Sequence, residues 1–483
     1  MVARCGPLPG PRFRIPFLAA LTFRQQARPR PLFPRGNAVT GGNRRIFTRY
    51  YRSLKDFRAF PVAMTEQSVA TGQRPIPFLV GWLARLLPPA LERDDRAFFR
   101  DLAALGAALF AITIVAYALT IDWTGAIPRD GTTLAVGRDF LNFWMYGRAA
   151  VTADPGQFYD LDAYRGAIRG LLGMELNGQN WSYPPSIMLL AAPFGQLSCL
   201  VALACWTSIG VAVFVAVGRK QVCDWRILVP VALSPAALFC LISGQSSFLT
   251  AAMLIAIFAL LDRRPVAAGI LIGLLTIKPQ LGILFPFMLI ASGRWRVFIV
   301  AAVAALALAG ATAAIFGAQV WIDFVLKGLP VQGLVLSDPD RIATPFFPTV
   351  FMNLRGLDLG YAAAMSVQAI FSAFALGAVI WAFRFRRDAD PPLMLALFLA
   401  CSVVASPYLL AYDLLPLTFA AVALLASTRL DASGRRLVQL TYWTPALQLA
   451  LGTYHLPGPA LIAPAFAAYL LIRLRASPGP ALA

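Results

Sequence analysis

The sequence predicts an all-α integral membrane protein, a multispanning helical bundle whose outer loops carry short amphipathic helices. Of the 483 residues, 59% are apolar and only 13% are charged, and the mean hydropathy is +0.68. A soluble protein has about 25% charged residues. Several apolar runs also reach ~17–25 residues, the length that crosses a hydrocarbon core of ~30 Å. Both observations exclude an ordinary soluble enzyme and predict several membrane crossings.

The first 63 residues differ in composition from the remainder of the chain. They hold 13 of the 42 Lys and Arg but only Asp56 among the 23 acids, so they carry +12 of the net charge of +19. The excess charge is therefore local, and we expect no nucleic-acid partner. Such an Arg-rich, Pro-rich stretch buries little apolar surface, so we expect a disordered extension or a true start at Met64, with a targeting peptide as the alternative. Residues 64–96 are then a cytoplasmic leader, 97–475 the membrane domain and 476–483 a cytoplasmic tail.

Apolar runs mark the expected spans in chain order. Clear runs occur at 102–121, 198–218, 226–242, 246–261, 297–316 and 361–383, and weaker ones at 393–408, 411–427, 438–452 and 459–472. The segment between Arg264 and Arg294 is too long for one straight span and is interrupted by Lys278-Pro279. Proline lacks the amide hydrogen of a helix interior, so we expect a hairpin of two short helices with Lys278-Pro279-Gln280 at its outer, membrane-embedded tip. The total is then about twelve crossings.

Basic residues orient these spans, because cytoplasmic loops carry the excess of Lys and Arg. The expected cytoplasmic ends are 219–226, 263–264, 294–296, 384–387, 429–436 and 473–475. The expected outer segments are the long loops 122–184 and 317–360 and the joints 243–245, 406–408 and 453–457. Most polar residues that can do chemistry therefore share the extracytoplasmic face.

Two ionisable residues stand out, and each allows two interpretations. Asp139 opens an amphipathic stretch with Phe140, Phe143 and Trp144 at helical spacing. It is either a helix N-cap or a functional carboxylate. Lys278 lies within a predicted apolar segment, where a cation has a partner or a function unless its side chain extends to the surface.

No cofactor or metal is expected. The lone His455 cannot make a histidine metal site, and the sequence has no GxxxxGK[ST] phosphate loop. The pairs Asp160/Asp162, Asp338/Asp340 and Asp388/Asp390 match the DxD pattern of metal-dependent glycosyltransferases, but three matches show how common that pattern is.

Five blocks carry a resemblance to a known family. They are GRDFLNFWMYGRAA from Gly137, DPGQFYD, YPPSIMLLAAPFGQLS, the segment SGQSSFLT to FPFML that contains TIKPQ, and SPYLLAYDLLPL. In order and spacing they resemble glycosyltransferase family 87 over roughly residues 97–475. That family is similar to the polyprenyl-phosphate-mannose-dependent mannosyltransferases of glycolipid synthesis, in the GT-C superfamily. Its relatives often carry His in the late outer joint, where this chain has Pro407-Tyr408 and Tyr412-Asp413.

The resemblance implies a GT-C-like fold in a bacterial plasma membrane, with the active site on the outer face and Asp139 as the catalytic residue. It also implies an inverting, mannosyl-type transfer from a polyprenyl-phosphate sugar to a lipid or glycan acceptor. Such a transfer needs one carboxylate as base and cations for the leaving phosphate. The expected phosphate-binding residues are Lys278, Arg138 and Arg341, and the expected substrate contacts are Tyr183, Gln245, Gln280, Tyr408 and Asp413. The alternative is a lipid or polysaccharide carrier, similar to a flippase, without transferase activity.

Overall fold

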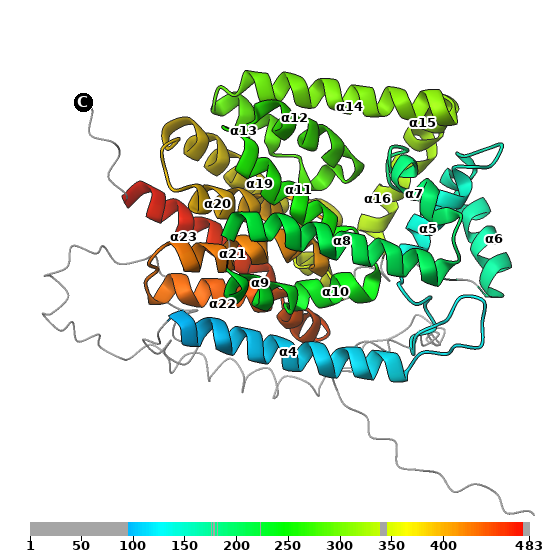
Figure 1. The fold of residues 1–483 in the computed structure, drawn as a ribbon, viewed down its shortest axis with the longest axis horizontal. Helices are drawn as coiled ribbons and strands as arrows, with labels where there is room; N and C mark the ends of the chain where they lie inside the picture. The colour runs from blue at the N-terminus through cyan, green and yellow to red at the C-terminus, as the bar shows by residue number, and fades with distance from the viewer. Residues whose placement is uncertain are drawn as a thin grey trace, which may run out of the picture. The chain divides into compact units, whose positions relative to one another are not determined.

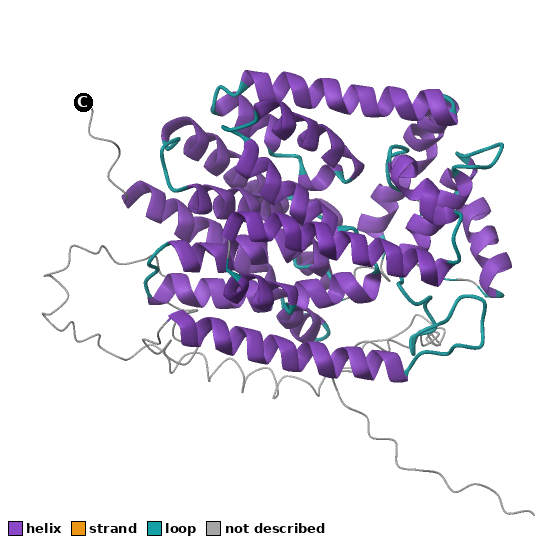
Figure 2. Cartoon of the chain, in the orientation of Figure 1, coloured by secondary structure: helices purple, strands orange, loops and turns teal. Residues whose placement is uncertain are grey.

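The computed structural model describes residues 95–174, 176, 179–180, 182–222, 224–338 and 345–476. Within these ranges the chain consists of helices and connecting loops, with two isolated β-bridges that pair Arg129 with Asp122 and Ala135 and no named strand (Figure 2). The predicted all-α membrane class is confirmed. The basic extension, most of the leader and the tail from residue 477 lie outside the described residues, as does Arg341.

Six helices are long and apolar enough to cross a membrane, and these described residues form a multi-pass membrane protein. They are Ala97–Leu119 within α4 (Asp95–Leu119), Cys199–Val222 (α8), Trp295–Phe316 (α14), Gln319–Ser337, Tyr361–Phe385 (α19) and Gly458–Ala476, which ends in α23 (Ile462–Ala476). Shorter apolar helices account for the other expected spans: α9 (Trp225–Ala232), α10 (Pro235–Ser243), α11 (Ser247–Leu260), α12 (Pro265–Leu274), α13 (Phe285–Ala291), α20 (Pro391–Ala405) and α21 (Leu415–Ser427). α22 (Ala432–Gly452) lies over the expected span 438–452. By length and composition the described crossings number six, or seven with one bent pair, so the expectation of about twelve requires the shorter helices to cross as well.

One expected span is bent, and one expectation about an outer loop was wrong. The run 226–242 is not one helix, because α9 and α10 are bent by 52°. Ser234 caps the start of α10 through its hydroxyl, and Pro235 follows at the first position, which favours a new helix start. The expected outer loop 317–360 also contains an apolar helical segment: α15 (Gln319–Asp323), a π-helical turn and α16 (Leu329–Ser337).

The hairpin around Lys278 is confirmed. α12 and α14 run parallel, since a Cβ on Gly269 would lie 2.7 Å from Val300 and one on Gly273 2.5 Å from Ala304. α13 lies between α12 and α14 in the chain. Because α12 and α14 are parallel, α13 must run back in the opposite direction, so the chain reverses at Lys278. Gly273 faces Ala304, well before the end of α14 at Phe316, so the Lys278 tip lies part of the way along the longer helix.

The helix ends separate into two groups, as the charge pattern predicts. Figure 1 shows α5 (Phe140–Ala149), α6 (Leu161–Leu172) and α7 (Ile187–Gly195) gathered at one end of α4, α8 and α14, and they share one apolar core. The predicted cytoplasmic ends contact one another instead. Their contacts join Arg294 to Asp262, Arg387 to Ala291, Arg386 to Arg475 and Arg473 to Arg429. The basic ends and the polar joints therefore lie in separate regions of the bundle.

Candidate active site

Asp139 lies at the start of α5, after a tight turn. Gly137 and Arg138 both have positive φ, at 82° and 37°, and a Cβ on Gly137 would lie 2.8 Å from the Leu203 side chain. Glycine is the residue that adopts this conformation without steric cost. The Asp139 side chain makes no capping hydrogen bond. The N-cap interpretation is therefore wrong, and the carboxylate is directed elsewhere.

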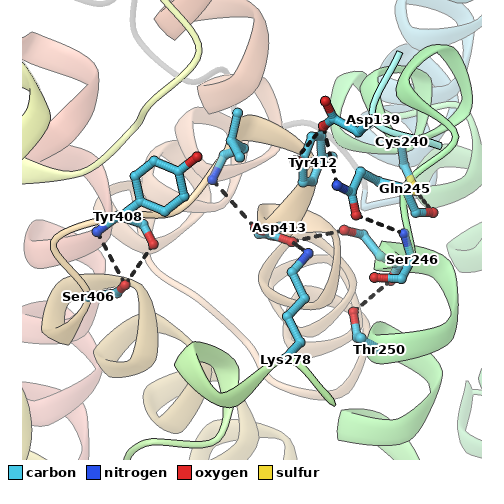
Figure 3. A network of polar contacts seen from close by, with 12 residues as sticks. Asp139, Cys240, Gln245, Ser246, Thr250, Lys278, Ser406, Tyr408, Tyr412 and Asp413 are labelled. Carbon is cyan, nitrogen blue, oxygen red and sulfur yellow. Dashed lines mark hydrogen bonds and ion pairs between the residues drawn. The ribbon is translucent and has the colours of Figure 1, made fainter. Parts of the chain in front are cut away.

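Two side chains from distant segments donate to this carboxylate (Figure 3). The Tyr412 hydroxyl lies 2.8 Å from Asp139 Oδ2, and Gln245 Nε2 lies 3.2 Å from the same oxygen. Asp139 is half-buried, and its other oxygen, Oδ1, accepts no hydrogen bond from the described residues. The carboxylate is thus fixed through one oxygen and has the other available.

Gln245 reaches Asp139 because α10 ends in a left-handed glycine. Gly244 has φ 59°, and a Cβ there would lie 2.6 Å from the Cβ of Phe140. The end of α10 can therefore lie directly against the start of α5. The Tyr183 hydroxyl lies 3.3 Å from Gln245 Nε2 and extends the same cluster. Two of the predicted substrate contacts, Tyr183 and Gln245, are thus brought together with Asp139.

Asp413 and Lys278 form a buried ion pair next to this cluster. Lys278 Nζ lies 2.5 Å from Asp413 Oδ1, and each side chain is only 2% exposed. The Ser247 hydroxyl donates to the same oxygen at 2.9 Å, and the amide of Leu410 lies 3.5 Å from Oδ2. Lys278 does not extend to the surface, and its ammonium also lies 5.1 Å from the centre of the Tyr412 ring.

Other predicted site residues lie outside the cluster. The Arg138 guanidinium pairs with Asp130, with 2.8 Å between Nε and Oδ2. Gln280 is half-buried in the turn after Lys278 and does not hydrogen-bond to the cluster. The Tyr408 ring packs on Phe347 with 5.1 Å between ring centres. Of the expected cations within the described residues, Lys278 shares the neighbour Tyr412 with Asp139, and both Lys278 and Arg138 are already paired with other carboxylates.

The sequence reasoning missed Tyr412 and Ser247 as site residues. Tyr412 is the neighbour of Asp413 in a block that the resemblance already contained, and Ser247 lies in the SGQSS block. Both residues therefore stood in sequence blocks that the resemblance had already marked. What the sequence did not show is that Tyr412 points to Asp139 while Asp413 points to Lys278.

The tyrosines around Asp139 stay protonated at neutral pH. Burial raises the pKa of the Tyr183 hydroxyl above its ordinary value. Burial, and then the charge of Asp139, raise the pKa of Tyr164 on α6 well above the ordinary value. Tyr183 is thus a neutral donor in the site.

The described residues contain no group of three or more His, Cys, Asp or Glu that could hold a metal ion. Of the three DxD pairs, Asp160-Leu161-Asp162 is a helix start. The Asp160 carboxylate accepts from the amides of Asp162 and Ala163 at 3.0 and 3.1 Å. That local role explains the pattern without a metal.

These features define a class of protein: a helical membrane protein with an available carboxylate among polar joints from distant segments. Residues 181–411 match the model of glycosyltransferase family 87, which supports the resemblance that the sequence blocks carry. The family indicates a glycosyltransferase. The matched segment contains Tyr183, Gln245 and Lys278, whereas Asp139 precedes it and Tyr412 and Asp413 directly follow it. No curated protein and no solved structure matches the chain.

Proposed function

We propose that the chain is an inverting glycosyltransferase of the GT-C type, which moves a hexose, mannose first among the candidates, from a polyprenyl phosphate to a lipid or glycan acceptor. The observation that supports this most is the Asp139 carboxylate, fixed through Oδ2 by Tyr412 and Gln245 with Oδ1 available. A general base must be both oriented and accessible to the proton that it accepts.

In the proposed reaction, the acceptor hydroxyl oxygen forms a bond to the anomeric carbon as the bond from that carbon to the phosphate oxygen breaks. Asp139 Oδ1 accepts the hydroxyl proton, and polyprenyl phosphate leaves with the bonding electron pair. Because phosphate is a good leaving group, no second carboxyl is needed to donate a proton, unlike in most glycosidases. One carboxylate is therefore sufficient.

The donor phosphate is assigned to Lys278. An ammonium has three N–H donors, and Asp413 takes one of them. Since the Lys278 side chain is only 2% exposed, the donor must displace side chains that pack around it, among them Tyr412, whose ring centre lies 5.1 Å from Nζ. Arg138 is the second candidate and would have to exchange Asp130 for phosphate.

We further propose that the protein lies in a bacterial plasma membrane with Asp139 on the extracytoplasmic face. The separation of the basic helix ends from the polar joints supports this orientation. Single cysteines at Thr152 and Asp388, treated with a membrane-impermeant thiol reagent, test it. We expect labelling at Thr152 alone in intact cells, and equal labelling of both positions contradicts the orientation.

The test of the reaction uses purified protein in lipid nanodiscs with polyprenyl-phosphate mannose and a lipid extract. A transferase releases polyprenyl phosphate and forms a new glycolipid in equal amounts. A carrier binds the donor and releases neither. Donor binding without either product would favour the carrier.

A further inference from the structure

Two buried tyrosines bind the backbone of Tyr183, a member of the Asp139 cluster. The Tyr146 hydroxyl accepts from the backbone N–H of Tyr183 at 2.7 Å, and the Tyr159 hydroxyl donates to the Tyr183 carbonyl oxygen at 2.8 Å. Between α6 and α7 the described residues form no helix or strand. The two hydroxyl groups therefore give the Tyr183 backbone the partners that regular secondary structure gives it elsewhere.

Tyr146 belongs to the same helix as the proposed base. It follows Asp139 by seven residues, which is about two helical turns, so the two residues lie on the same face of α5. α5 packs closely on α7, because a Cβ on Gly147 would overlap the carbonyl oxygen of Ala191. One firmly packed helix thus positions both Asp139 and the Tyr183 backbone.

Tyr159 is held in turn by the apolar segment that contains α15 and α16. A Cβ on Gly328 would lie 2.7 Å from Tyr159 Cδ1, so glycine leaves room for the ring. From α16, Gln332 Nε2 donates to the carbonyl oxygen of Ser182 at 3.2 Å. The segment therefore supports Tyr183 twice, through Tyr159 and through the preceding residue.

The Tyr183 side chain connects this backbone position to Asp139. Gln245 Oε1 accepts from the amide of Ser246 at 3.1 Å, and Nε2 faces Asp139 Oδ2 and the Tyr183 hydroxyl. The distance from Nε2 to the Tyr183 hydroxyl is 3.3 Å, longer than the usual ~2.7–3.2 Å of an N–H···O bond. A displacement of Tyr183 by a few tenths of an ångström is therefore enough to break this contact.

We propose that Tyr146 and Tyr159 are positioning residues for the transfer reaction. They hold the Tyr183 backbone, Tyr183 holds Gln245, and Gln245 holds Asp139 Oδ2. The proposal rests on the proposed function, because it concerns the orientation of the proposed base. It requires that the effect of either tyrosine on turnover depends on the Tyr183 hydroxyl.

Tyr159→Phe removes the donor to the Tyr183 carbonyl and keeps the ring. In full-length protein in lipid nanodiscs, with polyprenyl-phosphate mannose and a lipid extract, we expect kcat to fall about fivefold and the donor KM to stay within about twofold. In a Tyr183→Phe background, where no hydroxyl reaches Gln245, the same substitution should change kcat by less than about twofold. An equal fall in both backgrounds means that Tyr159 only supports the fold, and it overturns the proposal.

Tyr442→Phe is the matched control. The Tyr442 hydroxyl is also buried and donates to a backbone carbonyl, that of Pro230, at 2.9 Å, where α22 contacts α9. Its loss should lower the unfolding temperature about as much as Tyr159→Phe and leave kcat unchanged, and a fall in kcat equal to that of Tyr159→Phe overturns the proposal. If Tyr159→Phe does not fold, Gln332→Met takes its place with the same expectation.

Hydrogen exchange, measured by mass spectrometry, tests the backbone contacts without transfer. Pro184 and Pro185 have no amide hydrogen, so exchange in this segment reports on Tyr183 and few neighbours. We expect Tyr146→Phe and Tyr159→Phe to speed exchange there at least about tenfold, and Tyr442→Phe to leave it unchanged.

The two measurements separate the proposal from the proposed function. Wild-type exchange and wild-type kcat in the folded Tyr146→Phe and Tyr159→Phe variants overturn the positioning role and leave the proposed function intact. A wild-type protein that forms no product contradicts the proposed function itself, and the positioning role in transfer with it, whatever the exchange rates are.

Discussion

Asp139 and Asp413 are two carboxylates with Tyr412 between them, and their surroundings differ. Asp413 is buried and accepts from an ammonium, a hydroxyl and a backbone amide. Asp139 is half-buried and accepts from two neutral side chains through one oxygen. A carboxylate whose acceptor positions are occupied stabilises the fold, whereas one with an available oxygen can take a proton. On this comparison we propose a structural role for Asp413 and a chemical role for Asp139, and five substitutions test the proposal.

The largest effect is expected from breaking the buried ion pair. Lys278→Met leaves Asp413 without a counter-charge, which costs about 3–5 kcal/mol when a partner of a buried pair is removed. Thermal unfolding in detergent measures it. The double variant Lys278→Met/Asp413→Leu removes both charges and should recover most of this stability. A single variant as stable as the wild type contradicts the structural role of the pair.

The double variant also tests the phosphate assignment, because it separates folding from donor binding. If Lys278 holds the donor phosphate, the folded double variant should show a donor KM raised about tenfold or more, since a charged hydrogen bond contributes about 1.5–3 kcal/mol. An unchanged donor KM removes Lys278 from the donor site.

Asp139→Asn should lower kcat about 100-fold or more, which is ~2.7 kcal/mol in the barrier, and leave the unfolding temperature unchanged. Asn matches Asp in shape but cannot accept the acceptor's proton. Transfer from the polyprenyl-phosphate sugar measures the effect. Wild-type turnover would remove Asp139 from the catalytic role and make Asp413 the next candidate.

Tyr412→Phe should have a smaller effect. It removes one of the two donors to Asp139 Oδ2 but keeps the ring beside Lys278, so we expect kcat to fall about tenfold, in line with one hydrogen bond to a charged group. Acceptor KM and unfolding temperature should stay near the wild-type values. Equal losses of stability and of turnover would instead mean that Tyr412 only supports the fold.

Ser247→Ala gives the smallest expected change in turnover. The hydroxyl is one of three donors to Asp413, so its loss should cost about 1.5 kcal/mol of stability. Turnover should stay within about twofold of the wild type, because Asp139 keeps both donors. A large loss of kcat in a folded protein would show that Asp413 also takes part in the chemistry.

The sequence predicted the helical membrane class, the broken hairpin at Lys278 and the grouping of polar joints, because hydropathy, proline and charge act locally along the chain. It failed at Gln319–Ser337, where Asp323 and Lys327 lower the apparent hydropathy of an apolar helix. These two side chains pair one turn apart, at 3.2 Å, so the helix tolerates both charges.

For the site, the sequence identified most of the residue types but not their partners. Lys278 was expected to face a phosphate and faces Asp413, and Arg138 faces Asp130. Charges that neutralise one another look the same in the sequence as charges that await a ligand. Only the approach of distant segments distinguishes them, such as the contact of α5 with the end of α10 that Gly137 and Gly244 permit.

The Lys278–Asp413 pair has a consequence for synthesis of the protein. The two residues are 135 positions apart in the chain. At about 5–20 residues per second, the ribosome makes Asp413 roughly 7–27 s after Lys278. During that interval the nascent hairpin carries an ammonium whose final counter-ion has not yet been made. Until Asp413 is made, we expect the hairpin to lie in water, among lipid headgroups or within the insertion machinery. It reaches its final depth in the membrane only after the segment that contains Asp413 has been synthesised.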